Sequence, residues 1–267
     1  MFGKRNRPAQ PAQPVQPAQP RQTSGHATSG GEPPRTPPPP AEAKFPWSGD
    51  PSAVACNLAT GNLANNLASW VAREGRVHAE TYVAASGAIA GYAAQRSMTA
   101  QDPAAPVHVV TTSSGEKYLF GDPLNDMLLA KTEAEADGRV WPRASGAAMS
   151  TGLPVSRMPR VEDMFAHVTE SLGSLLEGRP STGSNHQPIV PVRQLLALTW
   201  PHVSRLFDGG FDGVHRRFGP VPSQWWCAVA AYATARPIID VADVLKPAIA
   251  LTILMESAIY ASKLTKF

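Results

Sequence analysis

Proline recurs at every third position near the N-terminus, and this spacing limits what the first part of the chain can fold into. From Pro8 the sequence reads five Pro-x-Gln triplets, ending at Gln22. Proline lacks a backbone N–H and fixes φ, so it is excluded at this frequency from helix interiors and central strands. Polyproline II, with three residues per turn, fits the spacing.

The rest of residues 1–45 has the same low-complexity character. A Ser/Thr/Gly stretch at residues 23–31 is followed by four consecutive prolines, Pro37–Pro40. Such a segment buries too little apolar surface to offset the entropy of ordering, so a disordered, proline-rich tail is predicted. We favour the view that this tail is a solvated spacer. The alternative is that it is a ligand for a domain that binds proline motifs, since Pro37 and Pro40 form a P-x-x-P with Arg35 nearby.

Residues 46–267 are expected to form one globular domain, because about 220 residues suffice for one sizeable core. The tail holds six of the 24 basic residues and two of the 21 acidic ones, so the net charge of +3 belongs to the tail and the body is nearly neutral. A near-neutral body gives little support to a nucleic-acid-binding domain. We therefore do not expect nucleic acid as a partner, except for weak binding through the basic tail.

The sequence also indicates where in the cell the protein is located. Met1 leads into polar, proline-rich sequence rather than a signal peptide, and the apolar stretches at 83–94, 225–235 and 248–261 are too short or too interrupted to span a membrane. Cys56 and Cys227 lie far apart in apolar surroundings, as buried free thiols do in a reducing compartment. We expect a cytoplasmic protein without a membrane span.

Hydrophobic periodicity predicts a mainly α fold of about seven or eight helices with one small β-hairpin. Asp50 is the predicted N-cap of the first helix, Pro201 a predicted kink, and Pro237 a predicted stop. The last helix is expected to be kinked or entered at Pro247. The predicted helices cover about residues 50–73, 77–97, 124–130, 139–149, 161–176, 191–207, 222–236 and 241–262, and the hairpin strands 107–111 and 116–120. Gly87 and Gly91 share one face of the second helix, where a neighbouring backbone could approach closely.

Four short stretches carry a resemblance to a known family. They are Gly75-Arg-Val-His-Ala-Glu-Thr81, Phe120-Gly-Asp-Pro-Leu-Asn125, Asn185-His-Gln-Pro188 and the ending Met255-Glu256 with Ser262-Lys263. Together they resemble an uncharacterised family of bacterial cytoplasmic proteins of unknown function, over about residues 55–265. The resemblance implies a bacterial cytoplasmic protein and carries no activity or ligand with it.

His78-Ala79-Glu80 is the first candidate for chemistry, since zinc nucleoside deaminases use an H-x-E motif. The P-C-x-x-C that completes their site is missing, which excludes the standard deaminase site. We favour a His and Glu held in local hydrogen bonds at a helix start. A metal site assembled from distant residues is the alternative, with His78 and His167 as weak metal candidates. The other members of such a site would be Glu80, Asp122, His186 and His202.

The familiar catalytic and cofactor motifs are missing. The body contains no G-x-S-x-G elbow, no phosphate-binding G-x-x-x-x-G-K-[ST] and no G-x-G-x-x-G, and neither cysteine has an electropositive neighbourhood. No cofactor is predicted. Glu256 lies in an apolar run and must face water, pair with a cation or shift its pKa. Its expected partner is Arg76, Arg96 or Lys263.

Two functions remain. The first is a non-enzymatic binding or scaffold module tethered by the tail, which binds a protein partner or self-associates. One indole of Trp225 and Trp226 is expected in the core and the other at a partner surface. The further binding candidates are Glu256, Asn125 and His186. The alternative is a metal-assisted, hydrolase-like enzyme with catalytic residues His78, Glu80, Asp122 and His167, which requires His78 and Asp122 to lie within hydrogen-bond reach.

Overall fold

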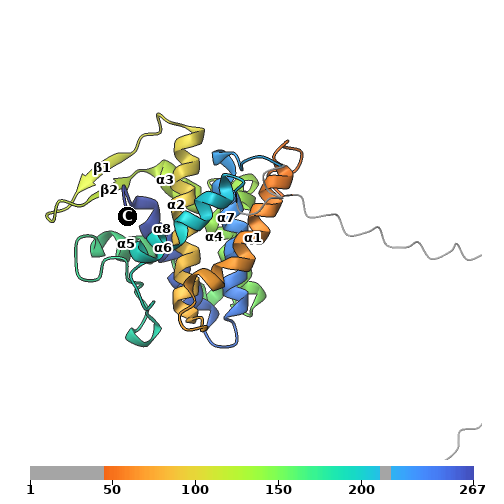
Figure 1. Ribbon diagram of the computed structural model, residues 1–267. Helices are drawn as coiled ribbons and strands as arrows, with labels where there is room; N and C mark the ends of the chain where they lie inside the picture. Colours follow the sequence, from red (N-terminus) through yellow and green to blue (C-terminus); the bar gives the residue numbers. More distant parts are fainter. Residues whose placement is uncertain (1–44, 211–217) are drawn as a thin grey trace, which may run out of the picture. The chain divides into compact units, whose positions relative to one another are not determined.

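The computed structural model describes residues 45–210 and 218–267. Within these ranges the chain forms eight α-helices and a single two-stranded hairpin (Figure 1), which confirms the predicted mainly α fold. The predicted tail lies outside the described residues, apart from Phe45. The elements are α1 (Ala53–Val71), α2 (Ala79–Gln101), β1 (His108–Thr111), β2 (Lys117–Phe120), α3 (Asp122–Leu129), α4 (Val140–Ser150), α5 (Val161–Ser171), α6 (Val192–Phe207), α7 (Trp226–Asp240) and α8 (Pro247–Lys263).

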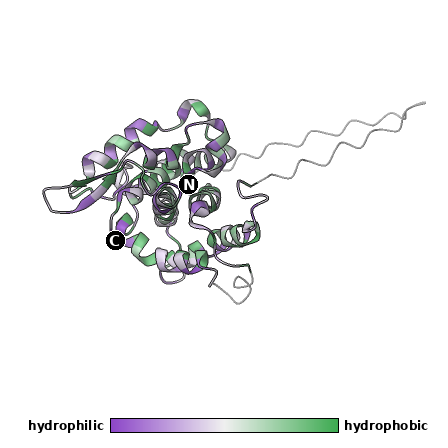
Figure 2. Ribbon diagram, turned by 90° about the horizontal axis from the view of Figure 1, so that it is seen from above, coloured by the Kyte–Doolittle hydropathy of each residue, from purple (hydrophilic) through white to green (hydrophobic). Residues whose placement is uncertain are grey.

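Helices α2 and α8 form the centre of the fold. Residues 80–91 of α2 and 253–263 of α8 are buried on every face, as is typical of helices in the core of a larger protein. Each of the other helices contacts α2, α8 or both. The view from above shows hydrophobic and hydrophilic residues mixed on the helices around the centre (Figure 2). No helix among residues 45–210 and 218–267 combines the length and apolar character that crossing a membrane requires.

The two glycines of α2 lie where α2 meets α8. A Cβ at Gly87 would overlap the backbone carbonyl of Leu254, and one at Gly91 would overlap that of Ala258. The two helix backbones therefore touch along this face, as the spacing of the glycines predicts. Any side chain there would have to push the central helices apart.

The hairpin is antiparallel, with His108 opposite Phe120 and Thr111 opposite Lys117. On its other edge β2 forms a bridge between Tyr118 and Leu264, just after α8. The C-terminal end of the chain thus attaches the hairpin to the helical body. All four residues of β1 are exposed.

Several helix boundaries differ from the prediction. The first helix is capped at Ser52, and Asp50 instead accepts hydrogen bonds from the Ser52 backbone N–H and hydroxyl. Helix α5 ends at Ser171, not near residue 176, because Gly173 turns the backbone into the left-handed region (φ +74°). Leu175, which lies within the predicted helix 161–176, is 98% exposed.

Helices α6 and α7 each contain a proline inside their span, and neither helix ends there. Helix α7 continues through Pro237 to Asp240, so the predicted stop is wrong. Ile238 beyond the proline is buried, and Asp240 accepts hydrogen bonds from Tyr82 and Arg236. The burial of Ile238 and the contact with Tyr82 of α2, together with the ion pair that Asp240 forms within α7, outweigh the single backbone hydrogen bond that the proline removes. Helix α6 likewise contains Pro201 within its span, and α8 begins only at Pro247.

Candidate functional site

The loop between α5 and α6 brings several predicted site residues together. Glu80 in the first turn of α2 is buried, and its carboxylate lies beside two imidazoles. His186 of the loop places Nδ1 3.0 Å from Glu80 Oε1, and Nε2 of His78 lies 3.4 Å from Oε2. Two sequence motifs more than a hundred residues apart therefore meet at one carboxylate.

His78 also has a local structural role. It is the N-cap of α2, and its Nδ1 lies 3.0 Å from the hydroxyl of Thr81 and accepts from the Thr81 backbone N–H at 3.4 Å. The Thr81 hydroxyl in turn accepts from the backbone N–H of Ile189 at 3.0 Å. These contacts give the backbone N–H of Thr81, in the first turn of α2, a hydrogen-bond partner. They also bind the end of the loop to this turn.

The other end of the loop is held by Glu256 on α8. Oε1 of Glu256 accepts from the Ser181 hydroxyl and Oε2 from the Ser181 backbone N–H, both at 2.6 Å. The partner of Glu256 is therefore a serine of the loop and not a cation, which corrects the expectation of Arg76, Arg96 or Lys263. Burial raises the pKa of Glu256, against the two hydrogen bonds from Ser181 and the charge of His167, which lower it.

A pocket of about 350 Å³ opens on the same loop. His167 of α5 forms one wall, and residues of the loop form the rest: Leu176, Arg179, Pro180, Ser181, Thr182, Ser184 and Gln187. His167 Nε2 lies 2.9 Å from the carbonyl oxygen of Arg179, which fixes the imidazole against the loop. Gln187 donates to the carbonyls of Pro180 and Thr182, and its buried Oε1 has no hydrogen-bond partner.

The four residues proposed for a metal-assisted enzyme do not meet. His78 precedes the first turn of α2, whereas Pro123 and Asp126 of α3 share a pocket with Gln101 and neighbouring residues at the opposite end of α2. A 23-residue helix separates the two ends by roughly 33 Å. Asp122 and Asn125, both on α3, are thus remote from His78. Within the described ranges no three or more His, Cys, Asp or Glu side chains are grouped so that they could hold a metal ion.

The neighbouring tryptophans have different surroundings. Trp226 packs against Phe207 and Trp200, with ring centroids 4.8 and 5.9 Å away. Trp225 instead lines a pocket of about 440 Å³, and its indole N–H donates to Asp50. His202, the remaining histidine candidate, stacks on Trp70 with the two rings 5.0 Å apart.

The Trp225 pocket is built from four parts of the chain. Phe45 and Pro46 meet the ends of α2 and α7 and the 3₁₀ helix Glu133–Gly138. Phe45 is itself fixed by stacking on Trp47 at 5.2 Å. Cys227 lies beneath, buried and without a disulfide, as is Cys56. Burial raises the pKa of the Cys227 thiol to about 11, so this thiol is a poor nucleophile near neutral pH.

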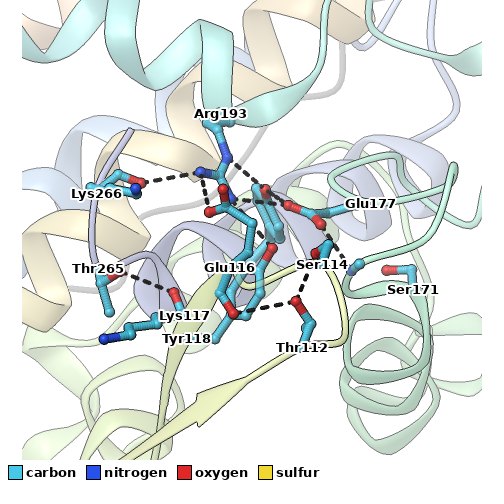
Figure 3. Close-up of polar contacts among 12 residues, drawn as sticks. Thr112, Ser114, Glu116, Lys117, Tyr118, Ser171, Glu177, Arg193, Thr265 and Lys266 are labelled. Carbon is cyan, nitrogen blue, oxygen red and sulfur yellow. Dashed lines mark hydrogen bonds and ion pairs between the residues drawn. The ribbon is translucent and has the colours of Figure 1, made fainter.

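One cluster was not anticipated from the sequence. Arg193, near the start of α6, contacts Tyr260 through Nε, Tyr118 and Glu177 through Nη2, and Glu116 through Nη1, at 3.1 to 3.3 Å. Figure 3 shows these groups converging on the guanidinium. A fifth contact reaches the carbonyl oxygen of Lys266 at 3.5 Å. All five N–H groups of Arg193 face a partner within the protein, so the cluster is structural.

The chain was compared with protein families, with curated proteins and with solved structures. No family model matches it, and neither a curated protein nor a solved structure is similar to it.

Proposed function

We propose that residues 46–267 form a binding module and that the Trp225 pocket takes a short peptide segment of a partner protein. The observation that carries the proposal is the pocket itself: about 440 Å³, with an aromatic wall and polar groups at its edge. Pockets of this size that are formed before the ligand arrives are typical of ligand sites.

The walls are held in place by contacts within the protein. The Trp225 indole is fixed by Asp50, and Gln101 Nε2 donates to the carbonyl oxygen of Gln224 at 3.0 Å. A pre-organised site loses little side-chain entropy when it binds. Trp225 and Ala228 offer apolar surface to an anchoring side chain.

The polar groups suit a peptide backbone. Gln101 and Gln224 are exposed at the pocket, and an amide side chain offers both a donor and an acceptor to a peptide group. The nearby acidic groups are engaged elsewhere: Asp137 pairs with Arg143 at 2.5 Å, and Glu135 accepts from the Lys131 backbone N–H. Arg139 keeps a buried Nε without a partner. The pocket thus favours a ligand with an apolar anchor and backbone acceptors.

The first described residues of the chain fit this function, because Phe45 and Pro46 belong to the pocket wall. Residues 1–45 would then act as a tether that keeps the module close to its partner. The two unpaired cysteines agree with a cytoplasmic setting. No observation on the described residues favours the metal-assisted hydrolase.

The test is a selection of peptides from a random-sequence display library on the full chain. Enriched peptides should share an apolar anchor and bind measurably by fluorescence polarisation. Trp225→Ala should weaken binding about 30-fold, the equivalent of a roughly 2 kcal/mol hot spot. Trp70→Ala is the matched control, since Trp70 stacks on His202 of α6. Peptides that bind Trp225→Ala as well as the wild type would refute this site.

A further inference from the structure

We infer that Ser181 is a nucleophile and Glu256 its general base, and that the 350 Å³ pocket beside them takes a small carboxylic ester. This site is separate from the Trp225 pocket and carries a covalent reaction that the binding function does not include. The juxtaposition behind the inference is that the hydroxyl of Ser181, an exposed residue of the pocket wall, lies 2.6 Å from the carboxylate of Glu256, a residue that is 3% exposed.

The geometry meets the first requirement for nucleophilic catalysis. A base must lie within hydrogen-bond reach of the proton that it removes, about 2.6 to 3.2 Å between heavy atoms. The Ser181 hydroxyl donates to Oε1 of Glu256, and its backbone N–H donates to Oε2, so the serine is held in one orientation. Ser181 is an exposed residue and lines the pocket, which places it where a substrate could reach it.

The surroundings of Glu256 meet the second requirement. An ordinary carboxylate is too weak a base to activate a hydroxyl, but burial in the α8 run raises the pKa of Glu256 and strengthens it as a base. His167, in the wall of the same pocket, interacts electrostatically with this carboxylate. Arg179 lines the pocket as well and supplies a positive charge for the developing oxyanion.

The reaction balances without a cofactor. The Ser181 oxygen bonds to the ester carbonyl carbon while its proton passes to Glu256. The C–O bond to the alcohol then breaks, and the alcohol leaves with that proton. Glu256 then takes a proton from water, whose oxygen bonds to the acyl carbon. The bond from that carbon to the Ser181 oxygen breaks, the proton on Glu256 passes to this oxygen, and the carboxylic acid leaves.

The alternative is that Ser181 only anchors the loop to α8. A purely structural serine would not react with electrophiles, whatever its effect on stability. Gln187, in the pocket wall, has a buried Oε1 acceptor that the loop leaves without a partner. The pocket and the Gln187 acceptor are therefore features that the contact between Ser181 and Glu256 does not need for anchoring the loop.

The experiment treats the folded full chain with a fluorophosphonate probe, whose P–F bond breaks as the Ser181 oxygen bonds to phosphorus. We expect peptide mapping by mass spectrometry to place the label on Ser181. Ser181→Ala should abolish labelling, while Ser69→Ala, exposed on α1 and outside this pocket, should keep it. Glu256→Gln should slow labelling at least about 100-fold. Wild-type labelling should rise with pH as Glu256 loses its proton.

Either of two results would overturn the inference: no label on Ser181 in the folded wild type, or a wild-type labelling rate that does not depend on pH. The second measurement decides the matter even if circular dichroism shows that Glu256→Gln does not fold. Trp225→Ala should leave labelling unchanged, so failure of this site and failure of the peptide pocket can be told apart.

Discussion

Lys263 ends helix α8 with its ammonium group inside the protein. The residue is 2% exposed, and Nζ lies 4.1 Å from the centroid of the Phe120 ring and 5.9 Å from that of Phe165. Desolvation lowers the pKa of this amine to about 8. The aromatic rings offer some compensation for the buried charge, but less than water does.

Replacing this charge should stabilise the protein. Because the folded pKa of about 8 lies below the ordinary 10.5, the unfolded chain binds more protons between these values, and stability rises with pH across that window. We expect Lys263→Met, which keeps the apolar stem, to raise the free energy of unfolding by roughly 1 to 3 kcal/mol near pH 7. The gain should disappear near pH 10.5. Urea denaturation at several pH values measures both effects.

The matched control is Lys117→Met at an exposed position of β2, which should leave stability near pH 7 almost unchanged. A Lys263→Met variant less stable than the wild type near pH 7 would contradict the expectation. It would mean that the contact with Phe120 outweighs desolvation.

Among the elements, the contact between α2 and α8 tolerates substitution least. Gly91→Ala places a methyl group on the Ala258 carbonyl, so the helices must separate. We expect a loss of about 3 kcal/mol, at the upper end of overpacking effects. Thermal unfolding followed by circular dichroism measures the change.

Gly61→Ala provides the control within a helix of the same protein. A Cβ at Gly61 of α1 would meet nothing within 4 Å, so alanine should instead stabilise by about 0.5 to 1 kcal/mol through helix propensity. Equal effects of the two substitutions would refute the close approach of the central helices.

For the whole molecule, the Arg193 cluster joins parts that are distant in sequence. It connects α6 and α8 with the hairpin through Glu116 and Tyr118, and with the segment after α5 through Glu177 (Figure 3). Burial alone would raise the pKa of Glu177, but hydrogen bonds, the largest from Tyr260, lower it below 4.5. The depressed pKa makes this carboxylate a stabilising group at neutral pH.

Glu177→Gln should therefore destabilise the protein in a pH-dependent way. A carboxylate with a lowered folded pKa contributes stability above pH 4.5, and the contribution is lost as the pH falls through the folded value. We expect a deficit of about 2 kcal/mol near pH 7 that shrinks in acid. Urea titrations from neutral to acidic pH would show it. The control is Glu162→Gln, exposed on α5, which should show neither the deficit nor its pH dependence. A deficit for Glu177→Gln that stays the same at every pH would contradict the argument.

The candidate site was only partly predictable. His78 and Glu80 stand out because of their H-x-E spacing, and Glu256 because a carboxylate in an apolar run needs a partner. Ser181 carries no local signature, since serine in a Pro/Ser/Thr/Gly loop is ordinary. Its contact with Glu256 spans 75 residues and depends on how the loop folds over α8.

What the sequence determined by itself is local in origin. Apolar periodicity determined that helices form and roughly where, and the spacing of Gly87 and Gly91 marked the face where two backbones touch, because both signals act over a few turns. Tertiary structure decided where helices end and which charges meet. Helix α7 passes Pro237 because Ile238 and Asp240 find partners, and Arg193 finds its five partners only once the hairpin, the C-terminus and two helices have come together. Contacts between distant segments depend on packing, and local sequence does not encode them.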